Sequence, residues 1–335
     1  HSKVNSITMN AHSDAMDAIS LNGISKRFGS VDVLRSLDLN VERGAIHGLV
    51  GLNGSGKTTT LECILGLQQF QSGCATILGF GPNELHRAEG DIVAVFDTPS
   101  LHAHLTVRQA LTHAALLLPT KKAAQGSAAE PQRSVDEVMS LLSLSRYESY
   151  KLRSLSLGNR RRTSIAHALL GNPKLVLLDE PFNGLDAGGV DEVLALIKTL
   201  NRDFGTSFLL SSHQLPYLQS VCTHLSILHG GQIVASGSLD DLLQSSEAKL
   251  IVRTHETASA QALLLQLDGV RSVVSENDAL TISLAGAKPA AVNQALVSAG
   301  FAVDELVHVR ASVDTLFREL TSGAPETPHA RVATS

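Results

Sequence analysis

The sequence has no long apolar run and no excess of basic charge. No hydrophobic stretch approaches the roughly 18–20 residues that a membrane-spanning helix needs, so any membrane role must be carried by a partner chain. The 27 basic and 32 acidic residues give a formal net charge of −5. This balance does not favour nucleic-acid binding, which usually shows a basic excess or a basic stripe, and no nucleic-acid partner is expected.

Cysteines are few, and the histidines lack the spacing of a metal site. Cys63, Cys74 and Cys222 form no Cys-x-x-Cys pair, and such thiols are most simply core residues in a reducing cytosol. The 14 histidines are scattered along the chain, without the paired spacing that holds zinc. Because no basic segment followed by an apolar stretch marks a secretory signal, a cytosolic location is expected.

The length of 335 residues and the apolar content of 43% predict a sizeable core and two domains, of which one can be small. Residues 18–245 show strands that alternate with helices, which is typical of a mostly parallel α/β sheet. Within them, residues from about 98 to 160 have helix-length apolar periods, which predict a helical subdomain. A polar, low-complexity linker at 119–131 interrupts that subdomain.

The remaining segments have different patterns. Short strands and helices over residues 246–321 predict a small C-terminal α+β domain, ferredoxin-like in its order of elements. Residues 1–17 and 322–335 are polar and irregular. Both ends are predicted to be disordered, because they can bury too little apolar surface to offset the entropy of ordering.

The most informative stretch is a glycine-rich segment between an apolar strand at 45–50 and a helix predicted over 59–67. Its residues are, in order, Gly51, Leu52, Asn53, Gly54, Ser55, Gly56, Lys57 and Thr58, followed by Thr59 at the start of the predicted helix. This spacing matches a P-loop, in which backbone N–H groups and a helix N-terminus bind phosphate oxygens. Lys57 is then placed to reach the β- and γ-phosphates, and the Thr58 hydroxyl to bind Mg²⁺. The motif predicts binding of a nucleoside triphosphate.

Further polar residues come directly after apolar strands. Residues 175–178 indicate a strand that is buried on both faces, and Asp179 and Glu180 follow it at the edge where α/β sheets place ligands. Asp179 is predicted to hold Mg²⁺ and Glu180 to reach the water that attacks the γ-phosphate. His213 follows another apolar strand, at 208–210. Its imidazole could there hydrogen-bond both the γ-phosphate and the catalytic base.

Residues 155–162, shortly before the Asp-Glu strand, resemble the Leu-Ser-Gly-Gly-Gln signature of ABC-type ATPases. Leu157 replaces the first glycine of that signature and Asn159 replaces its glutamine. Together with the P-loop, the Asp-Glu pair and the histidine in the same order, this makes residues 18–245 similar to an ABC-type P-loop NTPase. The resemblance implies that Ser156 and the Gly158 N–H bind the ATP held by the P-loop of a second subunit.

The same resemblance assigns several other residues. Phe28 matches the aromatic residue that stacks on adenine, and residues 183–186 match the D-loop. Asp97 stands where most members have glutamine, and it is predicted to bind Mg²⁺ through a bridging water and to sense Mg-ATP. Residues 98–105 would then pass the change to a membrane subunit. The acidic residue and the Ser-Leu-Gly of the signature are similar to bacitracin-resistance and lantibiotic-immunity exporters.

The resemblance therefore implies the ATP-hydrolysing subunit of an ABC exporter that uses ATP and Mg²⁺. Its implied partners are a separate transmembrane permease and a second ATPase subunit, at the cytoplasmic face of the membrane. One alternative is a soluble ABC-type ATPase that acts on the ribosome or on DNA, which the single P-loop and the absence of a long coiled coil disfavour. Another is a weakly hydrolysing regulatory subunit, which the departures at Leu157, Asn159 and Asp97 leave open.

Overall fold

The computed structural model describes residues 17–97, 101–118, 133–245, 249–276, 279–309 and 312–321. The chain divides into two compact units, the first ending its main part at Ser238 and the second beginning at Leu239. The segments predicted to be disordered, 1–17 and 322–335, lie outside the described residues apart from Asp17, as does the predicted linker.

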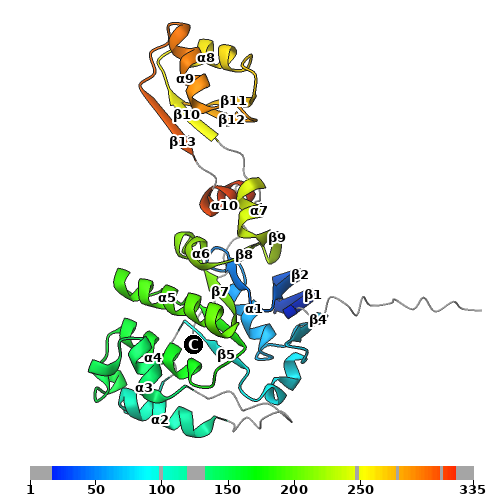
Figure 1. The fold of residues 1–335 in the computed structure, drawn as a ribbon. Coiled ribbons are helices and arrows are strands. Elements are labelled where there is room, and N and C mark those ends of the chain that lie inside the picture. The colour runs from blue at the N-terminus through cyan, green and yellow to red at the C-terminus, as the bar shows by residue number, and fades with distance from the viewer. Residues whose placement is uncertain are drawn as a thin grey trace, which may run out of the picture. The chain divides into compact units, whose positions relative to one another are not determined.

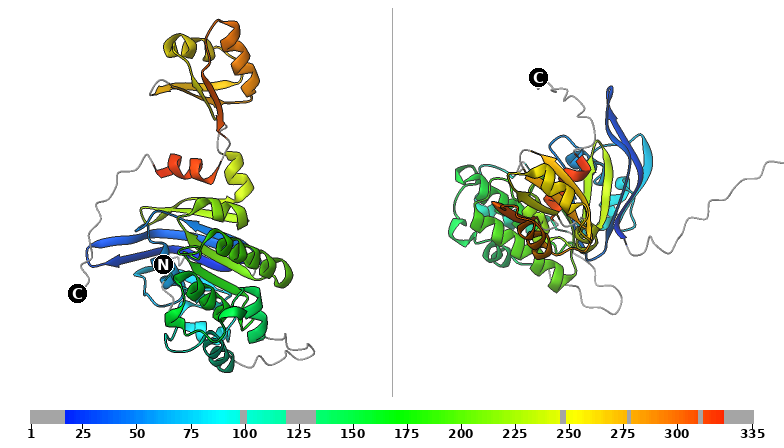
Figure 2. Two further views of the ribbon diagram at one scale, coloured as in Figure 1. Left: turned by 90° about the vertical axis from the view of Figure 1, so that its left-hand side faces the viewer. Right: turned by 90° about the horizontal axis from the view of Figure 1, so that it is seen from above.

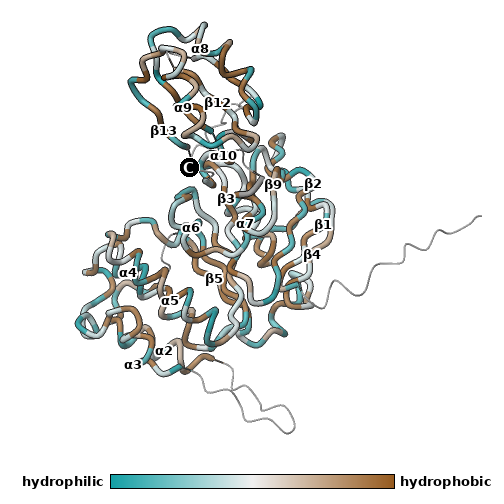
Figure 3. Tube along the Cα trace, turned by 45° about the horizontal axis from the view of Figure 1, so that its top comes forward, coloured by the Kyte–Doolittle hydropathy of each residue, from teal (hydrophilic) through white to brown (hydrophobic). Residues whose placement is uncertain are grey.

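A six-stranded sheet lies at the centre of the first unit, in the order β5-β6-β7-β3-β8-β9. Its strands are β3 (Ile46–Val50), β5 (Ile92–Val95), β6 (Leu175–Asp179), β7 (Ser207–Ser212), β8 (His224–His229) and β9 (Gln232–Ser238). Neighbouring strands are parallel except β8 and β9. Every residue of β3, β6 and β7 is buried, as in a parallel sheet covered on both faces, and Figure 3 shows β5 as an apolar segment. The predicted parallel α/β sheet is confirmed.

A smaller antiparallel sheet, in the order β2-β1-β4, shares its core with the central sheet. Its strands are β1 (Asp17–Phe28), β2 (Val31–Glu42) and β4 (Ser72–Ile77), and Figure 2 shows β1 and β2 as long strands side by side. Leu21 and Leu37 of this sheet are buried in one core with Leu61 of helix α1 (Lys57–Ile64) and with Leu177 and Leu209 of the central sheet. This core fixes the position of the loop between β3 and α1.

The other helices of the first unit are α2 (Val107–Leu117), α3 (Val135–Leu141), α4 (Leu157–Leu169), α5 (Ala187–Phe204) and α6 (Leu215–Val221), with 3₁₀ turns at Pro82–Ala88, Ser145–Tyr147 and Leu152–Ser154. Thr106 and Gln109 form a capping box that starts α2, which satisfies backbone N–H groups at the helix end. Helices α2, α3 and α4 contact one another and lie together at one end of the unit (Figure 1). Helices α2 and α3 lie within the residues predicted as a helical subdomain, about 98–160, whereas most of α4 lies beyond them. None of the helices in the described ranges is long and apolar enough to cross a membrane.

The second unit contains a four-stranded antiparallel sheet in the order β11-β12-β10-β13. Its elements are β10 (Lys249–Arg253), α8 (Thr257–Leu264), β11 (Val270–Glu276), β12 (Ala279–Leu284), α9 (Pro289–Ser298) and β13 (Glu305–Val309). This β-α-β-β-α-β order is the predicted ferredoxin-like one. The unit also includes α7 (Leu239–Ser245), which packs against α10 (Val313–Thr321), so it begins earlier than the predicted boundary after residue 245.

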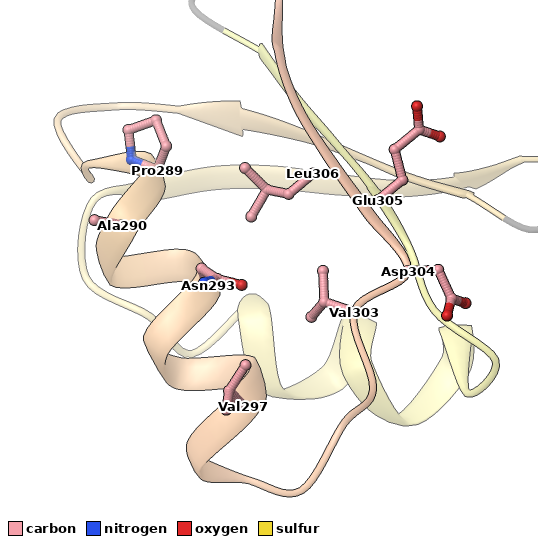
Figure 4. A pocket seen from close by; sticks show the side chains of 8 residues that line it. All are labelled: Pro289, Ala290, Asn293, Val297, Val303, Asp304, Glu305 and Leu306. Carbon is pink, nitrogen blue, oxygen red and sulfur yellow. The ribbon is translucent and has the colours of Figure 1, made fainter.

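A pocket lies beside α9 and β13 in the second unit. Its lining residues are Pro289, Ala290, Asn293, Val297, Val303, Asp304, Glu305 and Leu306. Leu306 points toward α9, whereas the Glu305 carboxylate points away from it (Figure 4). The face turned toward the helix is therefore apolar, and it contains none of the nucleotide-binding motifs found in the first unit.

His47 of β3 is a buried histidine with a strongly shifted pKa. Its Nε2 lies 2.8 Å from the Ser226 Oγ of β8, and its ring stacks on that of His224 with 6.1 Å between centroids. Burial, with a smaller electrostatic contribution from the neighbouring His224, lowers the pKa of His47 to about 3. The imidazole is therefore neutral in the folded protein at neutral pH.

We expect this buried imidazole to make the first unit less stable in mild acid. The unfolded state, with an ordinary pKa near 6.5, binds more protons than the folded state as the pH falls below that value, so stability is lost in that direction. Between pH 7 and pH 5 the loss is about 2 kcal/mol of unfolding free energy from this residue. Urea unfolding at both pH values measures it. His47→Gln should remove most of the loss, whereas His104→Gln, a change in an exposed loop, should keep it.

Candidate active site

The glycine-rich loop between β3 and α1 has a backbone that side chains would obstruct. Gly54 and Gly56 have φ angles of 84° and 108°, in the left-handed region that favours glycine. A Cβ on Gly51 would lie 2.7 Å from the Leu228 carbonyl oxygen, and one on Gly56 would lie 2.8 Å from a Leu34 methyl. Helix α1 begins without a side-chain cap, so its first N–H groups can bind an anion.

Two polar side chains complete this loop. The Lys57 Nζ donates to the carbonyl oxygens of Gly51 at 2.8 Å and Leu52 at 3.2 Å. It also lies 3.4 Å from the Glu180 Oε1, and the Lys57 side chain is only 6% exposed. The Ser55 Oγ is buried without a hydrogen-bond partner. A buried ammonium and an unpartnered hydroxyl in a glycine cradle fit a phosphate group.

Asp179 ends β6, and both of its carboxylate oxygens accept hydrogen bonds from hydroxyl groups. The Thr58 Oγ1 donates to Oδ2 at 2.9 Å, and the Ser211 Oγ donates to Oδ1. The structure therefore brings Thr58 and Asp179, predicted separately as magnesium ligands, into direct contact. A hydroxyl and a carboxylate oxygen are ligands that Mg²⁺ accepts.

Glu180, the next residue, is buried in a strained conformation. Its φ is 47°, which costs a residue other than glycine about 1–3 kcal/mol and is found most often at functional sites. The Ser212 Oγ donates to Oε2 at 3.1 Å, and the His213 Nδ1 lies 3.0 Å from both carboxylate oxygens. The predicted pair of Glu180 and His213 is thus in hydrogen-bond contact, beside Lys57.

The signature residues start helix α4. The Ser156 Oγ accepts a hydrogen bond from the Asn159 N–H at 3.3 Å, and this cap starts the helix at Leu157. A Cβ on Gly158 would lie 3.1 Å from the Gly184 carbonyl oxygen. Among the described residues no hydrogen bond or ion pair joins the signature to the P-loop, so within one chain these halves are separate.

Among the described residues, neither Phe28 nor Asp97 forms a hydrogen bond with the glycine-rich loop. Phe28 ends β1 and is 44% exposed, with the Lys26 Nζ 4.5 Å from its ring centroid; such a ring can stack on a planar base. The Asp97 Oδ1 accepts hydrogen bonds from Arg161 at 2.6 Å and from Asn183 at 3.2 Å. No group of three or more His, Cys, Asp or Glu side chains in the described ranges is placed to hold a metal. The role of Asp97 as a magnesium ligand stays a prediction.

Arg161 is a site residue that the sequence reasoning missed. It is 1% exposed, and its Nη1 donates to the carbonyl oxygens of Glu180 at 2.8 Å and Asp179 at 3.3 Å. In the sequence it belongs to a run of arginines that suggests a solvated surface. One feature of the sequence could have indicated that Arg161 is buried. Arg161 lies four positions before Ile165, and therefore on the same, apolar face of the signature helix.

Comparisons with known proteins agree with this geometry. Residues 34–183 match the family model described as ABC transporter. YdbJ of Bacillus subtilis (strain 168), an uncharacterized ABC transporter ATP-binding protein, is 32% identical over 91% of this chain and 96% of its own length. The chain belongs to the ABC transporter ATP-binding proteins. It therefore binds and hydrolyses ATP as a subunit of a transporter, and proteins of this family dimerise and work with transmembrane permease components.

Other members of the family are named for different cargo, and one of these names states import. The bacitracin transport ATP-binding protein BcrA of Bacillus licheniformis is 33% identical over 72% of this chain and 77% of its own length. The methionine import ATP-binding protein MetN of Clostridioides difficile (strain 630) is 28% identical over 67% of this chain and 70% of its own length. A solved ATP-binding subunit of an ABC transporter superposes with a TM-score of 0.60, at 28% identity over 68% of this chain and 92% of its own length.

Proposed function

We propose that this subunit powers export through a separate membrane-spanning subunit, at the cytoplasmic face of the membrane, with an antibiotic, peptide or drug as cargo. The observation that carries the proposal is the 33% identity to BcrA, which is named for bacitracin transport. Asp97 and the Ser-Leu-Gly of the signature, which resemble the bacitracin-resistance and lantibiotic-immunity group, support it. The importer MetN is a less identical relative, so import is the outcome that the experiment must exclude.

We propose further that the loop from Gly51 to Thr59 binds the triphosphate, with Phe28 stacked on the base. The cradle that a Cβ would fill and the unpartnered Ser55 hydroxyl support this assignment. Thr58 and Asp179, which already share a hydrogen bond, are the residues that would hold Mg²⁺, with Asp97 as a further candidate. The ion would neutralise charge on the phosphate oxygens.

For hydrolysis we propose Glu180 as the general base and His213 as the group that orients it. The carboxylate oxygens of Glu180 lie within hydrogen-bond distance of the His213 Nδ1, which supports this division of roles. Glu180 would accept a proton from the attacking water, and the Lys57 ammonium would neutralise charge on the transferred phosphoryl group. The left-handed backbone at Glu180 supports a carboxylate held in advance of the reaction.

We also propose that the complete site forms between two copies of the subunit or between it and a similar chain. Ser156 is exposed, and it has no hydrogen bond to the P-loop of its own chain. Ser156 and the Gly158 N–H would then close over the ATP bound by the partner. This arrangement would let ATP binding close the pair and let hydrolysis reopen it, which moves the membrane subunit.

The export proposal is tested with the full-length chain and its membrane partner. The partner is identified by cross-linking and co-purification from detergent-solubilised membranes, as a protein with several apolar segments of about 20 residues. Both chains are then expressed in a peptide-sensitive host, and growth is measured in bacitracin and related peptides. We expect resistance that needs both chains and that Glu180→Gln abolishes. ATP-dependent uptake of a nutrient, without resistance, would contradict the export proposal.

A further inference from the structure

Arg161 places a buried positive charge next to the backbone of the catalytic strand end. Its Nη1 donates to the carbonyl oxygens of Asp179 and Glu180, and its Nη2 donates to the carbonyl oxygen and to the carboxylate of Asp97. A guanidinium this deeply buried is stable only when a counter-charge and hydrogen bonds compensate its desolvation. Asp97 supplies that counter-charge, which a neutral glutamine at the same position would not.

A second chain of hydrogen bonds runs from Asp97 to the side chain of Glu180. The Asn183 Nδ2 donates to the Asp97 Oδ1 at 3.2 Å, and the Gln214 Nε2 donates to the Asn183 Oδ1 at 2.9 Å. The Gln214 N–H donates to the Ser212 Oγ at 3.1 Å, and that hydroxyl donates to the Glu180 Oε2 at 3.1 Å. Glu180 is therefore held at its carbonyl group by one route and at its carboxylate by another, and both routes meet at Asp97.

We propose that Asp97 and Arg161 act together as positioning residues for Glu180. The inference rests on the proposed role of Glu180 as the general base. Because a non-glycine residue leaves the left-handed region unless its surroundings hold it there, the hydrogen bond from Arg161 to the Glu180 carbonyl maintains the φ of 47°. That backbone conformation sets the direction of the Glu180 carboxylate toward the attacking water, while the P-loop binds ATP without it.

This pairing gives Asp97 a function that does not require contact with a metal. The Asp97 Oδ1 already accepts hydrogen bonds from Arg161 and Asn183. The negative charge of Asp97 therefore stabilises the buried Arg161 guanidinium. Loss of the Asp97 charge and loss of the Arg161 guanidinium should therefore have the same consequence, a misdirected Glu180. Misplacement of a reacting group by about 1 Å can reduce the rate by roughly 10²-fold, which sets the scale of the effect.

The test compares Asp97→Asn, Arg161→Gln and the double variant in the full-length chain bound to its membrane partner. Asp97→Asn keeps the shape of a half-exposed side chain, so it should fold even if Arg161→Gln does not. We expect each single variant to lower kcat by roughly 10–100-fold with the KM for ATP unchanged. Because both changes break the same ion pair, the double variant should lose no more than the worse single variant.

Arg133→Gln serves as the matched control. Arg133 is also a buried arginine, 7% exposed, and it donates to the Leu169 carbonyl oxygen at 3.1 Å and stacks on the Phe204 ring. Its loss should lower the melting temperature and leave kcat unchanged, which separates positioning from general destabilisation. The proposal would be overturned if the reduction in kcat of the double variant equalled the product of the two single reductions. A rise in KM with unchanged kcat would overturn it as well.

Glu180→Gln in the same complex separates this inference from the proposed function. If Glu180→Gln keeps normal turnover, the assignment of the general base is wrong and the positioning proposal is wrong with it. If Glu180→Gln is inactive while Asp97→Asn turns over like the wild type, Glu180 retains its role and the positioning proposal alone is wrong.

Discussion

Glu180→Gln is expected to bind ATP with normal affinity and to hydrolyse it about 10²–10⁴ times more slowly than the wild type. Glutamine has the same shape and still accepts the Ser212 hydrogen bond through its amide oxygen, so the buried site should stay packed. It cannot accept a proton from water, and it no longer offers a negative charge to Lys57, 3.4 Å away. Phosphate release under single-turnover conditions measures the chemical step, and a fluorescent nucleotide measures binding.

The variant should also accumulate a closed dimer in ATP, because closure no longer leads to hydrolysis and reopening. Size-exclusion chromatography with and without ATP reports this state. Glu84→Gln is the matched control, because the Glu84 carboxylate is half-exposed and its partners, the Arg87 guanidinium and the Gly81 N–H, belong to the same 3₁₀ turn and its cap. Near-normal turnover by Glu180→Gln would refute the role of general base.

The phosphate-binding half of the site was predictable because its signals are local. The glycine spacing of residues 51–58, the apolar run of β6 and the carboxylates after it each occupy a few consecutive positions. A buried parallel strand has an apolar run with no alternation, and the ligand edge of such a sheet follows its last residue. The contacts of Asp179 with Thr58 and of Glu180 with His213 therefore follow from the order of strands around β3.

Other strands are harder to recognise in the sequence because polar side chains interrupt their apolar pattern. Strand β8 contains His224, Ser226 and His229, which lowers its hydrophobicity. The structure compensates by pairing the Ser226 hydroxyl with His47 and with Ser236. Such pairing satisfies buried polar groups, but the contact with His47 joins residues 179 positions apart in the chain, so no local pattern indicates it.

The link between Asp97 and Arg161 was unpredictable for the same reason. The ion pair spans 64 positions in the chain, and it forms only when α4 packs beside the end of β5. The resemblance drew attention to Asp97 as an unusual residue, and it assigned the carboxylate to the metal. The local sequence around Arg161 gave no reason to connect the two residues.

Ser156→Arg is expected to abolish hydrolysis while leaving ATP binding to the single chain intact. The substitution removes the oxygen that caps α4 at the Asn159 N–H, which costs about 1 kcal/mol. It also adds a long cation at the positive end of a helix, in the surface proposed to close over the partner's ATP. Since Ser156 has no hydrogen bond to the P-loop of its own chain, nucleotide titration should give the wild-type affinity, and steady-state hydrolysis should disappear.

Mixing two inactive variants tests whether the site is shared between chains. Lys57→Ala removes the ammonium from the P-loop but leaves the signature intact, and Ser156→Arg does the reverse. In a mixed dimer, the intact P-loop of the Ser156→Arg chain faces the intact signature of the Lys57→Ala chain, so partial activity should return. Ser156→Ala loses the same cap without the added bulk and should stay partly active, which separates helix destabilisation from steric exclusion at the interface. A mixture that remains inactive while mixed dimers form would mean that the signature serves its own chain's nucleotide.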